Sequence, residues 1–193
     1  MVSSRAGWSA RHDGAAMITI RRARPSDAPG IGDVHVASWR STYAGVLPEP
    51  VLTGLSAPRQ AGYYDRVIRS GGGVHVAVAS GADAAPESGT RVVGFVTARR
   101  RRGALAEGEI ETLYVLDDFR ERGLGRQLLR AAAAHLAAHG CNSVFLWVLA
   151  DNPARWFYER MGGRHVADGT VGVGGIPVAQ AAYRWEPIDP LVG

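Results

Sequence analysis

The fold of this chain is decided by the stretch Arg120-Glu121-Arg122-Gly123-Leu124-Gly125-Arg126-Gln127-Leu128-Leu129, which reads R-x-x-G-x-G-R-x-L-L. A strand-like run, residues 109–115, comes shortly before it, and apolar residues recur at helical spacing after it. The motif is therefore predicted at a strand–loop–helix junction. Glycine lets backbone N–H groups approach a ligand, and the start of a helix favours an anion. The three arginines of the motif add charge for a polyanion.

This glycine-rich motif differs from other phosphate-binding motifs. The chain has neither G-x-G-x-x-G nor G-x-x-x-x-G-K-[ST], and it contains no lysine, which excludes a Walker-type lysine. A glycine-rich turn before a helix also occurs as a simple tight turn without a ligand. Taken alone, the motif leaves both interpretations open.

Three segments in the right order resemble the GNAT N-acetyltransferase superfamily. Leu113-Tyr114-Val115 followed by Arg120-x-x-Gly123-x-Gly125 is similar to its acyl-CoA-binding motif. Residues 146–163 resemble the strand and helix that follow this motif in the family. Residues 18–23, with Ser26-Asp27-Ala28, resemble its first strand and helix cap. The resemblance implies an α/β fold with a mixed central sheet of about seven strands, flanked by about four helices.

The length fits one domain, and the composition, 46% hydrophobic and 21% charged residues, is ordinary for a globular protein. We expect a single domain over residues 17–193 and a flexible N-terminal extension over residues 1–16. The extension has no apolar stretch, so it is typical neither of a secretory signal nor of a membrane span. The default compartment is the cytoplasm.

Charge and cysteine content bound the partners. All 22 basic residues are arginine, and the net charge is +4, which fits an anionic cofactor. The lone cysteine, Cys141, precludes an intrachain disulfide, and no zinc-ligand spacing exists, so no metal is implied. The run Arg99-Arg100-Arg101-Arg102 could grip nucleic acid, although a solvated strand end is the simpler interpretation.

Periodicity and turn signals predict an α/β sandwich with helices on both faces of a mixed sheet. Strands are expected over residues 17–22, 74–80, 92–100, 109–116, 143–148, 163–168 and 177–185. Helices are expected over residues 27–40, 58–69, 123–139 and 153–161. A proline-rich bend should occupy residues 45–58, and a glycine-rich connection, residues 169–175, should join the last two strands.

The resemblance assigns a set of cofactor contacts. It implies that the backbone of the fourth strand, at Leu113, Tyr114 and Val115, holds the pantetheine arm of acetyl-CoA. The pyrophosphate would lie on the loop from Arg120 to Arg126, whose members are Arg120, Glu121, Arg122, Gly123, Leu124, Gly125 and Arg126. Asn152 precedes Pro153 and is a good helix cap; the resemblance adds a side-chain contact to the cofactor.

Tyr158 shares a helical face with Ala154, Phe157 and Met161, which favours the core. The resemblance instead gives this tyrosine the role of an acid that protonates the leaving thiolate. Glu109 and Glu111 alternate with Leu113 and Val115, so all four side chains should share one face of their strand. The carboxylates suit either an exposed strand end or, by resemblance, a general base, with Glu109 better placed than Glu111.

Trp39 and Tyr43 are the expected acceptor contacts, because the first helices cover the acceptor pocket in the family and aromatic faces suit cationic amines. Together these features predict an acetyl-CoA-dependent N-acetyltransferase acting on a small-molecule or peptide amine by direct transfer. A non-catalytic acyl-CoA-binding sensor is the alternative, since it would need neither Tyr158 nor a carboxylate. Neither nucleic acid nor membrane is expected as a partner, and a homodimer stays open.

Overall fold

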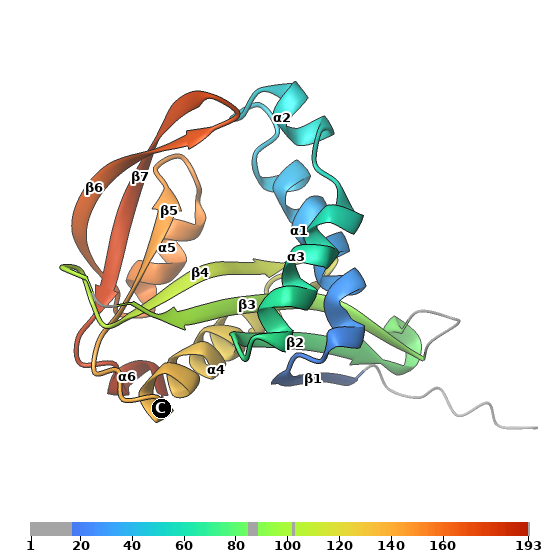
Figure 1. Cartoon of the computed structure of the whole chain (residues 1–193), viewed down its shortest axis with the longest axis horizontal. Helices are drawn as coiled ribbons and strands as arrows, with labels where there is room; N and C mark the ends of the chain where they lie inside the picture. Colours follow the sequence, from blue (N-terminus) through green and yellow to red (C-terminus); the bar gives the residue numbers. More distant parts are fainter. Residues whose placement is uncertain (1–16, 85–88, 102, 193) are drawn as a thin grey trace, which may run out of the picture.

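A computed structural model describes residues 17–84, 89–101 and 103–192 (Figure 1). The extension predicted over residues 1–16 lies outside this range. Seven strands form one mixed sheet, as the resemblance implied, and their order in the sheet is β1-β2-β3-β4-β5-β7-β6. The strands are β1 (Met17–Arg22), β2 (Gly73–Ser80), β3 (Thr90–Arg100), β4 (Gly108–Val115), β5 (Val144–Leu149), β6 (Arg164–Val173) and β7 (Ile176–Trp185).

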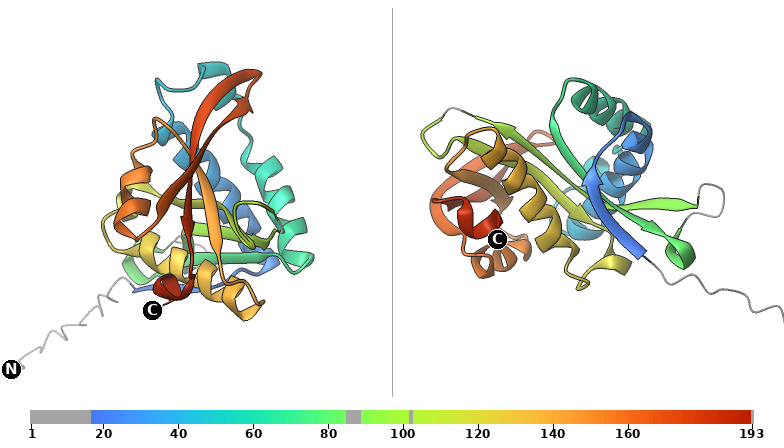
Figure 2. Two further views of the ribbon diagram at one scale, coloured as in Figure 1. Left: turned by 90° about the vertical axis from the view of Figure 1, so that its left-hand side faces the viewer. Right: turned by 90° about the horizontal axis from the view of Figure 1, so that it is seen from below.

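Helices cover both faces of the sheet. The α-helices of the described chain are α1 (Ala28–Thr42), α2 (Glu49–Thr53), α3 (Ala57–Arg69), α4 (Leu124–Ala138), α5 (Ala154–Arg160) and α6 (Asp189–Val192). Three single 3-10 turns, η1 (Pro25–Asp27), η2 (Gly81–Asp83) and η3 (Asp117–Phe119), complete the elements. Figure 2 shows α4 on one face of the sheet and the pair α1 and α3 on the other.

Each face has its own core. The α4 face buries Leu128, Leu129 and Leu136 against β2, β3 and β4, because these apolar residues recur along one side of α4. The opposite face packs Ile31 of α1 and Tyr64 of α3 on β2 and β3. The two cores fix the helices that flank the centre of the sheet.

The sheet splits at its centre. β4 and β5 run parallel and pair only through Gly108–Ile110 and Val144–Leu146; beyond these residues β4 pairs only with β3, and β5 only with β7. A bulge on β4 accompanies the split, because Thr97 of β3 faces Thr112 whereas Ala98 faces Ile110, which leaves Glu111 as the extra residue. A bulge bends its strand and increases the twist, so it helps to separate the two strands.

The connection between β6 and β7 is shorter than the sequence suggested. The glycine-rich stretch was expected to be a loop, but β6 extends to Val173 and β7 begins at Ile176. Only Gly174 and Gly175 form the turn, with φ of +58° and +84°. Positive φ at both central residues matches a two-residue hairpin, so two glycines suffice and the others join the strands.

Two short helices were not predicted. The proline-rich bend contains α2, which begins directly after Pro48, and α6 follows the last strand near the C-terminus. Proline suits the first turn of a helix, where its missing N–H has no partner to lose. The prolines of the bend therefore allow a short helix to begin within it.

Candidate active site

The loop before α4 offers unpaired backbone donors. Gly123 precedes α4 with φ of +75°, and Glu121 has φ of +62° although it is not glycine. Within the described chain, the N–H groups of residues 121–126 donate to no carbonyl or side chain, and the first bond of the helix runs from Gln127 N–H to Gly123. Successive free amides at a helix start form an anion site. The start of α4 is thus able to accept an anion.

The side chains of this loop take different positions. Arg120 lies 2.8 Å from Asp117, and Arg122 lies 3.1 Å from Asp83 and over the Phe119 ring. Arg126 is exposed. Leu124 is buried in the α4 core, so only its N–H can serve a ligand. Because guanidinium groups only donate hydrogen bonds, they leave the N–H groups of the loop available.

The backbone of β4 is open along the split. Leu116 N–H donates to the Val93 carbonyl of β3. Hydrogen-bonding directions alternate along an antiparallel strand, so the N–H and C=O groups of Leu113 and Val115 point away from β3, toward β5. No strand pairs with them there. This opening suits the amide groups of a pantetheine arm.

One expectation about β4 is wrong. Glu109 and Glu111 were expected on the same face as Leu113 and Val115, but the bulge at Glu111 shifts the alternation. Leu113 and Val115 pack on the α4 face, whereas both carboxylates lie on the face of α1 and α3 and contact Arg99. Tyr114 also points to that face, where it packs beside Phe95.

The two carboxylates differ in their partners. Glu109 is 8% exposed, and its Oε2 accepts hydrogen bonds from both Arg99 (3.1 Å) and Arg101 (2.7 Å). Glu111 lies 2.9 Å from Arg99 Nε and keeps part of its side chain in solvent. Burial raises the pKa of Glu111, although Arg99 opposes this shift. Glu111 is therefore the carboxylate whose environment better suits proton uptake.

A cluster of aromatic residues connects α1 with β4. Trp39 Nε1 donates to the Tyr114 hydroxyl (2.9 Å), and the Trp39 ring packs edge-on against Tyr43 at 5.2 Å. His35 stacks on Trp39, and burial lowers the pKa of His35 to about 4, so it is neutral at pH 7. Tyr43 accepts a hydrogen bond from Asn152 Nδ2 (3.0 Å). Tyr43, which was predicted to contact the acceptor, is thus hydrogen-bonded to Asn152, which was predicted to contact the cofactor.

Tyr158 combines a buried ring with a free hydroxyl. The residue is 6% exposed and packs against Phe157 and Trp185, as its helical spacing predicted. No described residue hydrogen-bonds its hydroxyl, and the only buried side-chain polar atoms without a partner in the described chain are Ser38 Oγ and His75 Nδ1. The Tyr158 hydroxyl is therefore available to a ligand. Burial raises the pKa of this phenol well above its usual range.

A second apolar cluster closes the far end of the split. Tyr43, Leu47 and Leu52 pack with Leu149 of β5 and with the β6–β7 hairpin. Gly174 in the hairpin turn lies so close to α2 that an added Cβ would come within 2.2 Å of Val51 Cγ2. Figure 1 shows α2 meeting the hairpin turn. This contact between α2 and the hairpin covers that end of the split.

The sequence missed a buried hydrogen-bond chain behind the bulge. His35 Nδ1 lies 2.8 Å from the Tyr64 hydroxyl, and Thr97 Oγ1 lies 2.7 Å from Thr112 Oγ1. The Tyr64 hydroxyl also interacts with Thr112, which follows the bulge residue. The only signal in the sequence was the placement of His35 one helical turn before Trp39, which does not reveal partners on other elements.

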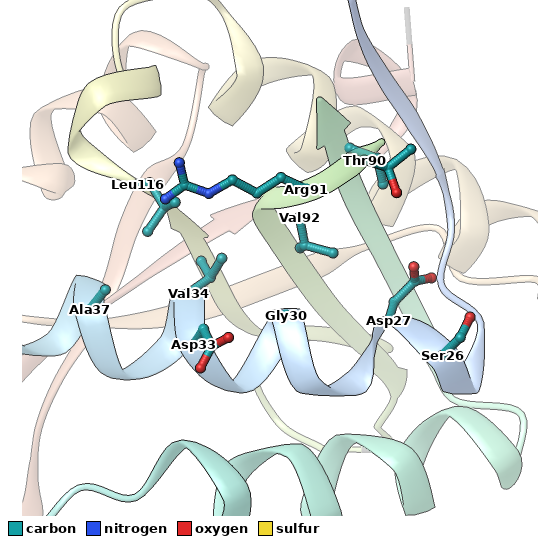
Figure 3. A pocket seen from close by; sticks show the side chains of 11 residues that line it. Ser26, Asp27, Gly30, Asp33, Val34, Ala37, Thr90, Arg91, Val92 and Leu116 are labelled. Carbon is teal, nitrogen blue, oxygen red and sulfur yellow. The ribbon is translucent and has the colours of Figure 1, made fainter. Parts of the chain in front are cut away.

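A pocket of about 390 Å³ lies elsewhere, between α1 and the ends of β2 and β3 (Figure 3). Asp33, Val34, Arg91 and Leu116 are among its lining residues, and Arg91 extends along it in Figure 3. Tyr158 and Asn152 do not line it. Its mixed lining identifies no ligand, so the split between β4 and β5 stays the candidate site.

Among the residues that the structure describes, no helix is long and apolar enough to cross a membrane. The same residues contain no group of three or more His, Cys, Asp or Glu side chains that could hold a metal ion. Arg99 and Arg101 of the basic run are paired with carboxylates, and Arg102 lies outside the described residues. This pairing favours the solvated strand end over a nucleic-acid grip.

Comparisons with known proteins agree with this geometry. The N-acetyltransferase YuaI of Bacillus subtilis, itself uncharacterized, is 32% identical over 178 residues, which are 91% of this chain and 96% of YuaI. A GCN5-related N-acetyltransferase from Rhodopseudomonas palustris has a similar structure, with a TM-score of 0.63 and 23% identity over 87% of this chain and 94% of that one.

The PaiA N-acetyltransferase of Thermoplasma acidophilum, solved in complex with coenzyme A, has a TM-score of 0.60 and 18% identity over 86% of this chain and 98% of its own. At such identities the structures establish the fold alone. The sequence model of the acetyltransferase (GNAT) family matches residues 39–163, which contain the loop, the bulge and Tyr158. Together with the relationship to YuaI, this match shows that the chain belongs to the GNAT family of acetyltransferases.

Proposed function

We propose that this protein transfers an acetyl group from acetyl-CoA to a primary amine while both substrates are bound. The observation that carries the proposal is the arrangement around the split. Free amides at the start of α4 stand ready for an anion, and the open backbone of β4 adjoins them. The free hydroxyl of Tyr158 belongs to the core on the same face of the sheet.

The residues of the split fit acetyl-CoA as a substrate. The N–H groups of residues 121–126 would hold the pyrophosphate, with Arg120, Arg122 and Arg126 nearby. Leu113 and Val115 would bind the pantetheine arm through their backbone. An unpaired amide of β4 would polarise the thioester carbonyl, as an oxyanion donor does. The Tyr114 side chain points away from this path, and we assign it to the acceptor side.

Glu111 is the base that we propose for the acceptor amine. An amine like that of lysine has a pKa of about 10.4, so its neutral form costs about 4.6 kcal/mol at pH 7. A carboxylate beside the acceptor attracts the cation and takes up its proton. The sequence favoured Glu109, but that carboxylate is held by two arginines. We therefore give Glu109 the role of placing Arg99 beside Glu111.

Tyr158 is the acid that we propose for the leaving group. The amine nitrogen forms a bond to the carbonyl carbon, the carbon–sulfur bond breaks, and the sulfur leaves with the electron pair. Tyr158 donates its proton to that sulfur. Its raised pKa keeps the phenol protonated at neutral pH, so a proton is available.

Trp39 and Tyr43 form the acceptor side of the proposal. Both lie on α1 or at its end, beside the roof formed by α2 and the β6–β7 hairpin. Aromatic faces stabilise cations by about 0.5–2 kcal/mol. The acceptor is thus an amine small enough to reach Glu111 beneath the roof, or the end of a peptide.

The alternative is a non-catalytic acyl-CoA sensor, which would use the loop before α4 and leave Tyr158 idle. Titration calorimetry with acetyl-CoA and a panel of amines assayed for free CoA release separate the two. Binding together with amine-dependent CoA release supports the transferase. Tight binding without release, across the panel, favours the sensor. The cytoplasmic location stays a prediction, and a homodimer stays open.

A further inference from the structure

The hydrogen bond between Asn152 and Tyr43 spans the split. Asn152 lies between β5 and α5, whereas Tyr43 ends α1, which covers the half of the sheet formed by β1 to β4. The two residues are 109 positions apart in the chain, yet Asn152 Nδ2 lies 3.0 Å from the Tyr43 hydroxyl. This bond therefore connects the two arms of the divided sheet.

Both ends of this bond are held in place. Asn152 Oδ1 accepts a hydrogen bond from Ala154 N–H (2.8 Å), which caps α5 and fixes the side-chain amide. Tyr43 is 5% exposed and packs against Trp39, which is hydrogen-bonded to Tyr114 of β4. The Tyr43 hydroxyl also interacts with that of Tyr114. A chain of contacts thus runs from β4 through α1 to the start of α5.

Tyr158 depends on the start of α5 for its position. It lies one helical turn after Ala154, so both side chains share one face of a helix that has only seven residues. Its hydroxyl has no partner of its own in the described chain and is near enough to Tyr43 for the two to interact electrostatically. The cap at Asn152 is therefore a direct means of placing the Tyr158 hydroxyl at the split.

We propose that Asn152 and Tyr43 form a tie across the split that positions Tyr158, and that the Asn152 side chain acts through this tie rather than as a ligand of the cofactor. The proposal rests on the proposed function, because it concerns the acid of that reaction. Asn152 and Tyr43 are positioning residues, and Tyr158 is the group that reaches the leaving sulfur.

Two substitutions cut the tie from opposite ends. Asn152→Ser keeps an oxygen that can cap α5 but is too short to reach Tyr43. Tyr43→Phe removes the hydroxyl and keeps the ring that packs on Trp39. The matched control is Tyr183→Phe, because Tyr183 also donates a hydrogen bond to α5, to Glu159 at 2.7 Å, but from β7. We would measure kcat and acetyl-CoA affinity for these three variants and for the Asn152→Ser/Tyr43→Phe double variant. The same measurements would be made for Asn152→Ser and for Tyr43→Phe in a Tyr158→Phe background.

We expect each cut to lower kcat by roughly 10- to 100-fold, because a misplacement of about 1 Å can cost about 10²-fold. The double variant should match the single variants, since both remove one connection. Acetyl-CoA affinity should stay close to that of the wild type, as should kcat in Tyr183→Phe. In the Tyr158→Phe background neither cut should lower kcat further.

If the wild-type protein acetylates an amine, three results would still overturn the proposed tie. Losses that multiply in the double variant would show two independent roles. A weaker acetyl-CoA affinity confined to Asn152→Ser would make Asn152 a cofactor ligand. An equal loss in Tyr183→Phe would reduce the effect to general loosening of α5. A wild type that binds acetyl-CoA and acetylates no amine would instead overturn the proposed function, and the tie with it.

Discussion

Arg99 Nε lies 2.9 Å from Glu111 Oε1, at the point where β4 bulges beside the split. Arg99 also contacts Glu109, so one guanidinium group serves both carboxylates. This arrangement gives the bulge residue a partner while part of its side chain stays accessible. It is the basis for separating the roles of the two glutamates.

Glu111→Gln should lower turnover with a strongly basic amine by roughly 10²–10⁴-fold, the usual contribution of a positioned base. Burial raises the pKa of Glu111, and the base works only when ionised, so wild-type kcat/KM should fall as the pH drops through a value above 4.5. That acidic limb should disappear in Glu111→Gln. The measurement is a pH profile of kcat/KM for wild type, Glu111→Gln and Glu109→Gln. A larger loss of turnover in Glu109→Gln would return the role of base to Glu109.

Gly123→Asp should weaken acetyl-CoA binding at least tenfold, about 1.4 kcal/mol, because it places a carboxylate beside the free amides. Gly140, at the other end of α4, has φ of +80° and open space around its Cα. Gly140→Asp therefore introduces the same left-handed strain far from the loop and should leave affinity unchanged. Calorimetric titration of both variants makes the comparison. Equal affinities in the two would remove the loop from the cofactor site.

Gly174→Ala should destabilise the protein more than Gly175→Ala. Both glycines have positive φ, but only at Gly174 would a Cβ meet Val51, at 2.2 Å. Such overpacking costs about 1–3 kcal/mol, which corresponds to a Tm difference of several degrees. Adding Val51→Ala should recover part of the loss. Equal Tm values for the two glycine variants would show that the hairpin turn does not press on α2.

Three histidines should make stability sensitive to acid. Burial lowers the pKa of His35 to about 4, and burial together with the charges of His135 and Arg22 lowers the pKa of His75 to about 4. His135, whose ring centroid lies 5.8 Å from that of His75, has its pKa lowered by burial and by the charges of His139 and Arg22. The unfolded chain, with a histidine pKa near 6.5, then binds protons first, so Tm should fall as the pH drops from about 6.5 to 4.

His75→Phe should make this decline shallower, and it also removes a buried Nδ1 that lacks a partner. His165→Gln, at a more exposed position, is the control. Melting curves between pH 7.5 and pH 4 give the comparison. A decline as steep as that of the wild type in His75→Phe would show that other groups govern the acid sensitivity.

The sequence predicted most elements of the fold because their signals are local. The apolar stripe of α4 and the glycines of the loop before it identify a strand–loop–helix unit, and Asn152 before Pro153 marks the start of α5. The face of the glutamates was mispredicted because period-2 alternation assumes regular pairing, and the bulge at Glu111 depends on the partner strand. Contacts between distant elements, such as Asn152 with Tyr43, leave no local pattern and could not be predicted.

In the reaction that we propose, Tyr158 completes acetyl transfer to an amine. Tyr158→Phe keeps the ring that packs against Phe157 and Trp185, so the fold and acetyl-CoA affinity should survive. The decisive measurement is kcat for free CoA release with an amine that the wild type accepts, alongside calorimetric affinity for acetyl-CoA. We expect kcat to fall by roughly 10²–10⁴-fold with little change in affinity. Wild-type turnover in Tyr158→Phe would contradict this role and leave this tyrosine a residue of the core.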